Sequence, residues 1–186
     1  MSTFLNTAGD PRRLKVHQVA ECIYAITYYF AHTYLEKGDR TIDQMIQAAR
    51  SGKQNITEGG IDGATSKEME IKLLNVARGS MHELLDDYKD YLMLRQLALW
   101  PYDSEKAQQT RRVCMMHNDP HFYQERIKTR SDETIANIAI TLIHQYDVMM
   151  RGLLDKKQND FLKDGGIREQ MTRARIEYRN NQNNRS

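Results

Sequence analysis

The residue set that comes nearest to known chemistry in this sequence is one cysteine with two histidines. Cys114, His117 and His121 have the spacing C-x2-H-x3-H, which is typical of zinc ligands. A structural zinc ion needs four ligands, and no obvious fourth is nearby apart from Asp119. We therefore favour the alternative, a buried cysteine beside two surface histidines, and expect neither a metal nor any other cofactor.

Two further kinds of chemistry are excluded by pattern. A di-iron site in a helical bundle uses Glu-x-x-His pairs, and none of the six histidines has an acidic residue three positions before it. The glycine-rich stretch 59–63 lacks the lysine and the following Ser or Thr of a phosphate-binding loop. We expect no catalytic residues and predict that the chain is not an enzyme.

Basic residues gather in two late segments of the chain. Residues 106–130 hold six Lys or Arg against two acids, and residues 163–186 hold six against three. Arginine forms paired hydrogen bonds with phosphate and stacks on bases. The predicted nucleic-acid-binding residues are therefore Arg111, Arg112, Arg126, Lys128 and Arg130 in the first segment, and Arg168, Arg175 and Arg179 in the second.

The charge of the whole chain keeps other readings open. The formal net charge is only +2, well below that of a strongly basic nucleic-acid-binding domain. Residues 62–90 have the opposite sign, with four bases against seven acids. The basic segments can therefore also be solvated faces, or they can contact the acidic region of a neighbouring subunit.

Long amphipathic helices must position these residues. Apolar residues recur every three or four positions, as in Val16, Val19, Ile23, Ile26 and Phe30. We predict helices over residues 12–36, 41–59, 65–97 and 131–157, a helical segment at 104–116 and a short amphipathic helix at 167–178. Thr65 with Glu68 is expected to form the capping box of the third helix. The fold class is all-α: an antiparallel four-helix bundle with a helical insert before its fourth long helix and a C-terminal amphipathic helix.

The domain organisation follows from the same pattern. We expect an N-terminal tail at residues 1–11, the bundle at 12–160, and a suffix helix with a polar tail at 161–186. No apolar run reaches the roughly 18 to 20 residues of a membrane span, so no membrane partner is expected. The two cysteines, Cys22 and Cys114, look unpaired, which favours a reducing compartment and predicts a cytoplasmic protein.

Several side chains are expected to hold the structure or its assembly together. Asn55 and Glu58 lie near the end of the second helix, where burial without partners would be costly. We expect them to form a buried polar cluster with Arg78. The bundle should leave five apolar residues for contacts between copies of the chain: Ile46, Leu85, Ile138, Ile143 and Met150. The suffix helix should dock on the bundle or on a neighbouring subunit through Ile167, Met171, Ala174 and Tyr178.

Short motifs are spread from Val16 to Tyr178. They are Asn55-Ile56-Thr57-Glu58-Gly59, Ser66-Lys67-Glu68, then Arg78, Ser80 and Glu83, then Ala136-Asn137-Ile138, His144-Gln145, Phe161 and Gly165-Gly166-Ile167-Arg168-Glu169. Together they resemble the four-helix-bundle family of ribosomal-RNA intervening-sequence proteins, in the variant that carries a C-terminal suffix. Lys53-Gln54 departs from the Pro-Ser-like approach found in many members, which leaves the expected fold untouched.

The resemblance implies a ring-shaped homo-oligomer, commonly a homo-pentamer, and it supplies no catalytic residues. A related bundle is the accessory protein of diversity-generating retroelements, which binds a reverse transcriptase and nucleic acid. The expected function is therefore a non-enzymatic oligomeric accessory protein that binds RNA, DNA or a nucleic-acid enzyme such as a reverse transcriptase. The alternative is a protein–protein scaffold without affinity for nucleic acid.

Overall fold

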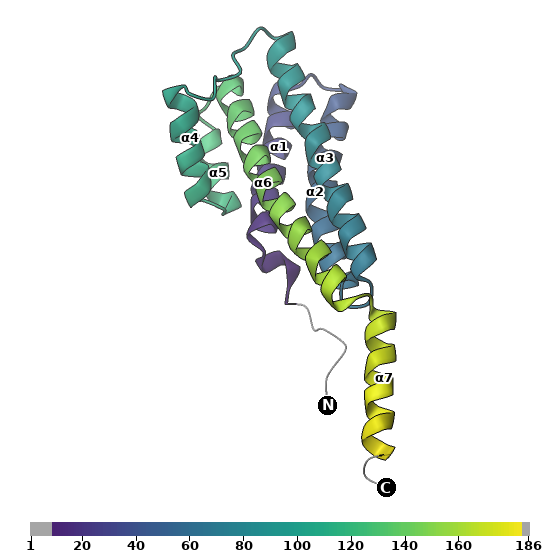
Figure 1. Cartoon of the computed structure of the whole chain (residues 1–186). Coiled ribbons are helices and arrows are strands. Elements are labelled where there is room, and N and C mark those ends of the chain that lie inside the picture. The colour runs from purple at the N-terminus through teal and green to yellow at the C-terminus, as the bar shows by residue number, and fades with distance from the viewer. Residues whose placement is uncertain (1–8, 184–186) are drawn as a thin grey trace.

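The computed structural model describes residues 9–183 of the chain, and within this range it is built from helices without strands. The predicted all-α helical bundle is confirmed (Figure 1). The elements in chain order are η1 (Pro11–Arg13), α1 (Lys15–Tyr34), α2 (Arg40–Asp62), α3 (Lys67–Leu94), α4 (Glu105–Met116), α5 (Pro120–Ile127), α6 (Asp132–Asp164) and α7 (Ile167–Asn183).

The four longest bundle helices pack as a closed set of neighbours. Helix α1 contacts α2 and α6, and α3 contacts α2 and α6. The Tyr34 hydroxyl at the end of α1 donates to the Arg130 carbonyl before α6, at 2.9 Å. At the opposite end, the Lys67 ammonium at the start of α3 lies 3.3 Å from the Asp164 carboxylate at the end of α6. These two links show that α6 runs antiparallel to both α1 and α3.

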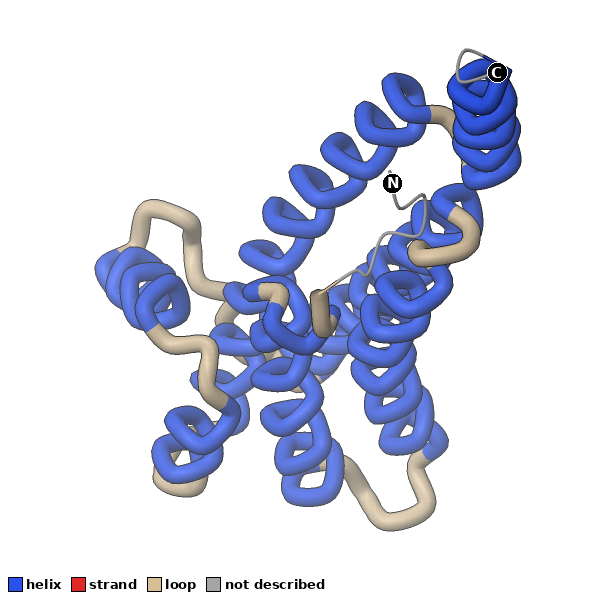
Figure 2. Tube along the Cα trace, turned by 90° about the horizontal axis from the view of Figure 1, so that it is seen from below, coloured by secondary structure: helices blue, strands red, loops and turns tan. Residues whose placement is uncertain are grey.

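The two short helices α4 and α5 lie outside this set. Helix α4 packs on α6, and α5 packs on α1. Figure 2 shows the same separation from below, with α4 and α5 standing apart from the pair α2 and α3. The insert before the fourth long helix therefore consists of two helices, of which the sequence predicted only the first, at residues 104–116.

The core follows the predicted apolar stripes. On α1, the side chains of Ile23, Ile26 and Phe30 are fully buried. Two tyrosines are also buried, and each places its hydroxyl on a partner. The Tyr88 hydroxyl donates to Thr27 Oγ1 at 3.0 Å, and the Tyr146 hydroxyl donates to the Gly52 carbonyl at 3.3 Å. Because these hydroxyls are satisfied, the rings can be buried without the penalty of an unpaired polar group.

The cap of α3 differs from the prediction by one residue. The N-cap is Ser66, whose hydroxyl accepts from the Met69 amide at 3.2 Å. Thr65 does not cap the helix, because its hydroxyl donates to the Asp62 carbonyl at 3.1 Å instead. The capping box of Thr65 and Glu68 was therefore wrong, although the helix begins where it was expected.

The paired glycines Gly59 and Gly60 do not end α2. The helix continues through both of them to Asp62. A Cβ at Gly59 would lie 3.3 Å from the Glu70 carbonyl oxygen. These glycines therefore serve close packing of α2 against its neighbours, whereas the sequence suggested a helix stop.

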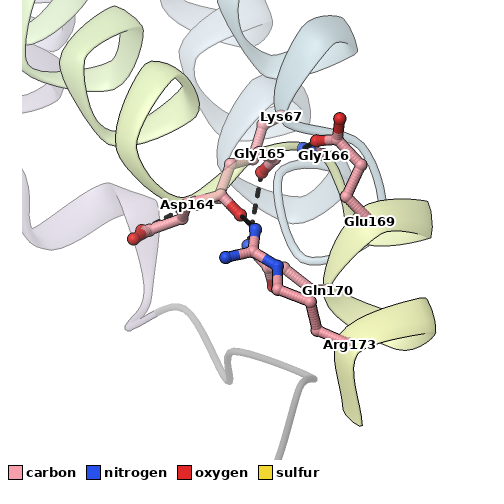
Figure 3. A network of polar contacts seen from close by, with 7 residues as sticks. All are labelled: Lys67, Asp164, Gly165, Gly166, Glu169, Gln170 and Arg173. Carbon is pink, nitrogen blue, oxygen red and sulfur yellow. Dashed lines mark hydrogen bonds and ion pairs between the residues drawn. The ribbon is translucent and has the colours of Figure 1, made fainter. Parts of the chain in front are cut away.

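Helix α6 is longer than predicted and crosses the expected boundary at residue 160, since it ends only at Asp164. Gly165 then adopts a φ of 72°, which favours glycine and breaks the helix. The joint to α7 is held by polar contacts (Figure 3): the Gly166 amide donates to Glu169 Oε2 at 2.8 Å, and Arg173 donates to the Asp164 carbonyl.

Beyond this joint, α7 projects away from the bundle as a single helix (Figure 1). The apolar side chains of Met171, Ile176 and Tyr178 are 48%, 52% and 62% exposed. Docking of the suffix helix on its own bundle was therefore wrong. Docking on a neighbouring subunit stays a prediction.

Three of the five apolar residues assigned to contacts between copies lie inside the chain itself. Leu85, Ile143 and Met150 are 5%, 1% and 0% exposed. They are part of the core, because the packed bundle helices bury more apolar side chains than the predicted stripes contained. Self-association stays a prediction, and these three residues cannot support it. Residues 1–8 of the expected N-terminal tail and 184–186 of the polar tail lie outside the described range.

Candidate nucleic-acid interface

Helices α4 and α5 carry the first basic segment, and each is fixed to the bundle by a few buried side chains. Ser104 caps α4 by accepting from the Ala107 amide at 3.3 Å, and Cys114 is buried on the inner side of that helix. Helix α5 begins with Asp119 as N-cap and Pro120 in its first turn, and it buries Tyr123 and Ile127. With the apolar side turned inward, the charged residues of both helices face solvent.

The predicted basic residues of this segment are on the surface. Arg112, Arg126, Lys128 and Arg130 are exposed, and Arg111 is partly exposed. We call these five residues together with Lys106 the α4–α5 basic surface. Only two acidic residues lie within residues 106–130, so this part of the chain carries a formal charge of about +4.

Aromatic rings accompany the cations of this surface. The Arg111 guanidinium lies 3.9 Å from the centre of the Tyr102 ring, and the Arg126 guanidinium lies 4.0 Å from that of Phe122. The Lys106 ammonium lies 5.6 Å from the centre of the Trp100 ring. Cations beside aromatic rings are the combination that binds phosphates and stacks bases in single-stranded nucleic acids.

The second basic segment lies elsewhere. Arg168, Arg175 and Arg179 are exposed on α7, and their spacing places them on one side of that helix. Figure 1 shows α7 leaving the bundle far from α4 and α5. The structure therefore does not bring the two predicted groups of basic residues together within one chain.

Cys114, His117 and His121 do not converge on a common point. Cys114 is buried, and burial raises the pKa of its thiol to about 11, although a hydrogen bond with Tyr123 lowers it in part. The His117 ring stacks on Phe122 with 3.7 Å between centroids and 7° between planes, and His121 is exposed. Across residues 9–183, the structure places no group of three His, Cys, Asp or Glu side chains where they could hold a metal ion.

The predicted polar cluster of Asn55, Glu58 and Arg78 does not form. The Asn55 amide donates to the Ser51 carbonyl one turn earlier, at 2.9 Å. Arg78 turns to α6 instead, where its Nε lies 2.6 Å from Asp147 Oδ1. Glu58 is exposed. The prediction failed because it placed Arg78 beside α2, whereas Arg78 lies on the side of α3 that faces α6.

An unpredicted ionic network surrounds Asp147. Besides Arg78, its carboxylate contacts His82 Nε2 at 2.9 Å and Arg151 Nε at 3.2 Å. Burial acts to raise the pKa of Asp147, but the hydrogen bonds from Arg78 and His82 outweigh it and hold that pKa below its usual value. Only the contact with Arg151 can be read from the sequence, because Arg151 lies four residues after Asp147 on the same helix. The contacts of Asp147 with Arg78 and His82 depend on how α3 and α6 are aligned.

The acidic region of α3 is also under electrostatic strain. Burial raises the pKa of Asp87, and the neighbouring charges of Asp90, Glu83 and Asp86 raise it further. Within the chain one cation already lies among these carboxylates, since the Lys89 ammonium is 3.6 Å from Asp86 Oδ1.

The α4–α5 basic surface offers side chains of the kinds that contact phosphates and stack on bases. No helix among residues 9–183 is both long and apolar enough to cross a bilayer.

Comparison of the chain with family models, with curated proteins and with solved structures finds no match. What this protein does must therefore be inferred from the geometry of its own residues.

Proposed function

We propose that the chain is a non-enzymatic accessory protein that binds nucleic acid through the α4–α5 basic surface. The observation that carries the proposal is the pairing of Lys106, Arg111 and Arg126 with aromatic rings on α5 and just before α4. Each pair places a cation that can meet a phosphate beside a ring; Phe122 already has His117 stacked on one face and Arg126 over the other, so Trp100 and Tyr102 are the rings left to meet a base. Single-stranded nucleic acid fits them better than duplex, whose bases are already stacked.

The net charge of the chain limits how strongly it binds as a monomer. A homo-oligomer would repeat the α4–α5 basic surface several times, and linked sites raise the apparent affinity without new contacts. The resemblance to bundles that form rings, commonly homo-pentamers, supports this arrangement. It also suggests a reverse transcriptase as the protein partner, in which case the chain would hold RNA or DNA close to that enzyme.

The proposal is tested by filter binding of a single-stranded RNA and a single-stranded DNA at two salt concentrations. Contacts with phosphates release counterions, so the affinity should fall steeply from about 50 to 200 mM salt. A variant in which Arg168, Arg175 and Arg179 are exchanged for Gln shows separately whether α7 contributes to nucleic-acid binding. If no binding occurs at the lower salt concentration, the nucleic-acid function is wrong.

A second function, a protein–protein scaffold without affinity for nucleic acid, is favoured by α7. On one face of this helix Met171 and Tyr178 lie seven residues apart and are 48% and 62% exposed. An apolar helix face with no partner in its own chain is typical of a contact with another protein or another copy. Light scattering should then give several times the monomer mass of 21.8 kDa. A monomer at tens of micromolar protein would contradict self-association.

A further inference from the structure

A cleft opens between α4, α5 and α6, next to the α4–α5 basic surface. Its volume is about 450 Å³, within the range of roughly 300 to 1,000 Å³ that is typical of sites for small ligands. Its deep part is apolar, because Cys114, Tyr123 and Ile127 line it and are 2%, 3% and 1% exposed. Ile138 of α6 adds to the same apolar lining.

Two aromatic rings at the cleft are held in place by contacts outside it. The Trp100 amide donates to Asn137 Oδ1 at 2.9 Å, and its indole Nε1 donates to Glu133 Oε1 at 3.1 Å. Phe122 is fixed between His117, which stacks on one face, and the Arg126 guanidinium, which lies 4.0 Å from the ring centre, so a ligand meets the edge of this ring. Because both rings are already ordered, a planar ligand that contacts them need not immobilise them on binding.

The charged residues that line the cleft all have one sign. They are Lys106, Arg126 and Arg130, and none of the described lining residues is acidic. Two carboxylates lie nearby: Glu133 accepts hydrogen bonds from Trp100 and the Ala98 amide, which lower its pKa, and Glu125 lies 3.7 Å from Arg126, so the three cations outnumber the acids around the cleft. The cleft therefore favours a ligand with a negative charge at one end.

The cleft also offers polar groups that can read a hydrogen-bonding edge. Gln109 and Thr110 of α4 line it, and so does Thr134 of α6. An amide and a hydroxyl can each donate and accept, so they fit the mixed donors and acceptors of a nucleobase. A fatty acid would leave these groups unpaired, and a phosphate alone would leave the apolar lining unused.

We infer that this cleft binds one nucleotide unit, with the base between the aromatic and apolar residues and the phosphate at Lys106, Arg126 and Arg130. The inference rests on the proposed function for its biological setting, since the nucleotide can belong to a bound single strand. The same chemistry is offered by a free nucleoside monophosphate.

Trp100 makes a direct test possible, because it is the only tryptophan of the chain and it lines the cleft. Its fluorescence is measured during titration with AMP and, separately, with a single-stranded oligo-adenylate. A tryptophan amide solution titrated in parallel corrects for absorption by the nucleotide. Anisotropy of a labelled oligo-adenylate measures binding of the strand to any part of the protein.

Saturable quenching by AMP is the expected result. Exchange of Arg126 and Arg130 for Gln should weaken AMP binding about tenfold or more, since charge-assisted hydrogen bonds to the phosphate are lost. The matched control exchanges Arg50 and Lys156 for Gln, which removes the same charge from exposed positions elsewhere. Equal weakening in both double variants would overturn the site and leave only a general effect of charge.

The combined readouts separate the two proposals. Quenching by both ligands supports the cleft as a subsite of strand binding, and quenching by AMP without strand binding supports a free-nucleotide site while contradicting the proposed function. Strand binding by anisotropy without any quenching would overturn the cleft and leave the proposed function standing. If neither ligand binds, both are overturned.

Discussion

Asp147 holds α3 and α6 together through an ionic network, so its loss should be felt in the stability of the bundle. The change we choose is Asp147→Asn, which keeps the size of the side chain and removes its charge. Arg78 then faces an amide that can still accept one hydrogen bond but no longer balances its charge. The expected result is a measurable loss of stability without loss of the fold.

The size of the effect follows from exposure. The Asp147 side chain is only 15% exposed and that of Arg78 34%, whereas His82 and Arg151 are 47% and 56% exposed. The two exposed partners should each contribute less than about 1 kcal/mol. A hydrogen bond to a charged group contributes about 1.5–3 kcal/mol, so we expect a loss of about 2 kcal/mol, most of it from Arg78. For a chain of this length that corresponds to a Tm lower by about 4–8 °C.

The effect should also depend on pH. The pKa of Asp147 is lower in the folded chain than its usual value. Its stabilisation is therefore complete above the unfolded pKa of about 3.9 and is lost as the pH falls through the folded pKa. The difference in stability between the wild type and Asp147→Asn should be constant near neutral pH and should shrink below about pH 4.

Urea unfolding followed by circular dichroism measures the change. Asp155→Asn is the matched control, because Asp155 lies two turns further along α6 and is exposed. It should change the free energy of unfolding by less than about 0.5 kcal/mol. A double-mutant cycle with Arg78→Met then isolates the contact between the two residues. Equal stability of Asp147→Asn and the control, or purely additive effects in the cycle, would refute the reasoning.

The remaining predictions concern single side chains. Glu58→Gln should leave the Tm nearly unchanged, because Glu58 is exposed. A free energy of unfolding lower by about 2–4 kcal/mol would contradict this and indicate that Glu58 belongs to a buried polar cluster. Gly79→Ala and Gly152→Ala should each stabilise the chain by about 0.4–1 kcal/mol in thermal melts, because a Cβ at either position meets no atom within 4 Å. Unchanged or lower stability would contradict this prediction. The Cys114 thiol should resist a thiol reagent at pH 8 in the native protein and react in denaturant, since it is buried with a pKa of about 11; rapid native labelling would contradict this.

The parts of the fold that the sequence predicted are those with a long periodic signal. The stripe of α1 and the start of α4 at Ser104 depend only on local spacing and capping, so they could be read without a structure. Helix α5 was missed because it is short. Asp119-Pro120 signals a turn as well as a helix start, and only Tyr123 and Ile127 are buried on that helix.

The parts that could not be predicted depend on the alignment of distant helices. Arg78 and Asp147 are 69 residues apart, and nothing local shows that they meet. The cleft is a similar case, because Trp100, Phe122 and Ile138 come together only when α4 and α5 pack on the bundle. The sequence did show that basic residues gather in the segment of α4 and α5, because charge is read directly from residue types.

The central claim is that the α4–α5 basic surface binds nucleic acid through its phosphates, and the salt dependence of binding tests it most directly. The measurement compares the wild type with a variant in which Arg111, Arg112 and Lys128, all outside the lining of the cleft, are exchanged for Gln. On a log–log plot for a single-stranded oligonucleotide, each phosphate neutralised contributes a slope of about 0.7. The variant should lose roughly two units of slope, equally for every sequence tested. An unchanged slope, with wild-type binding otherwise intact, would contradict it.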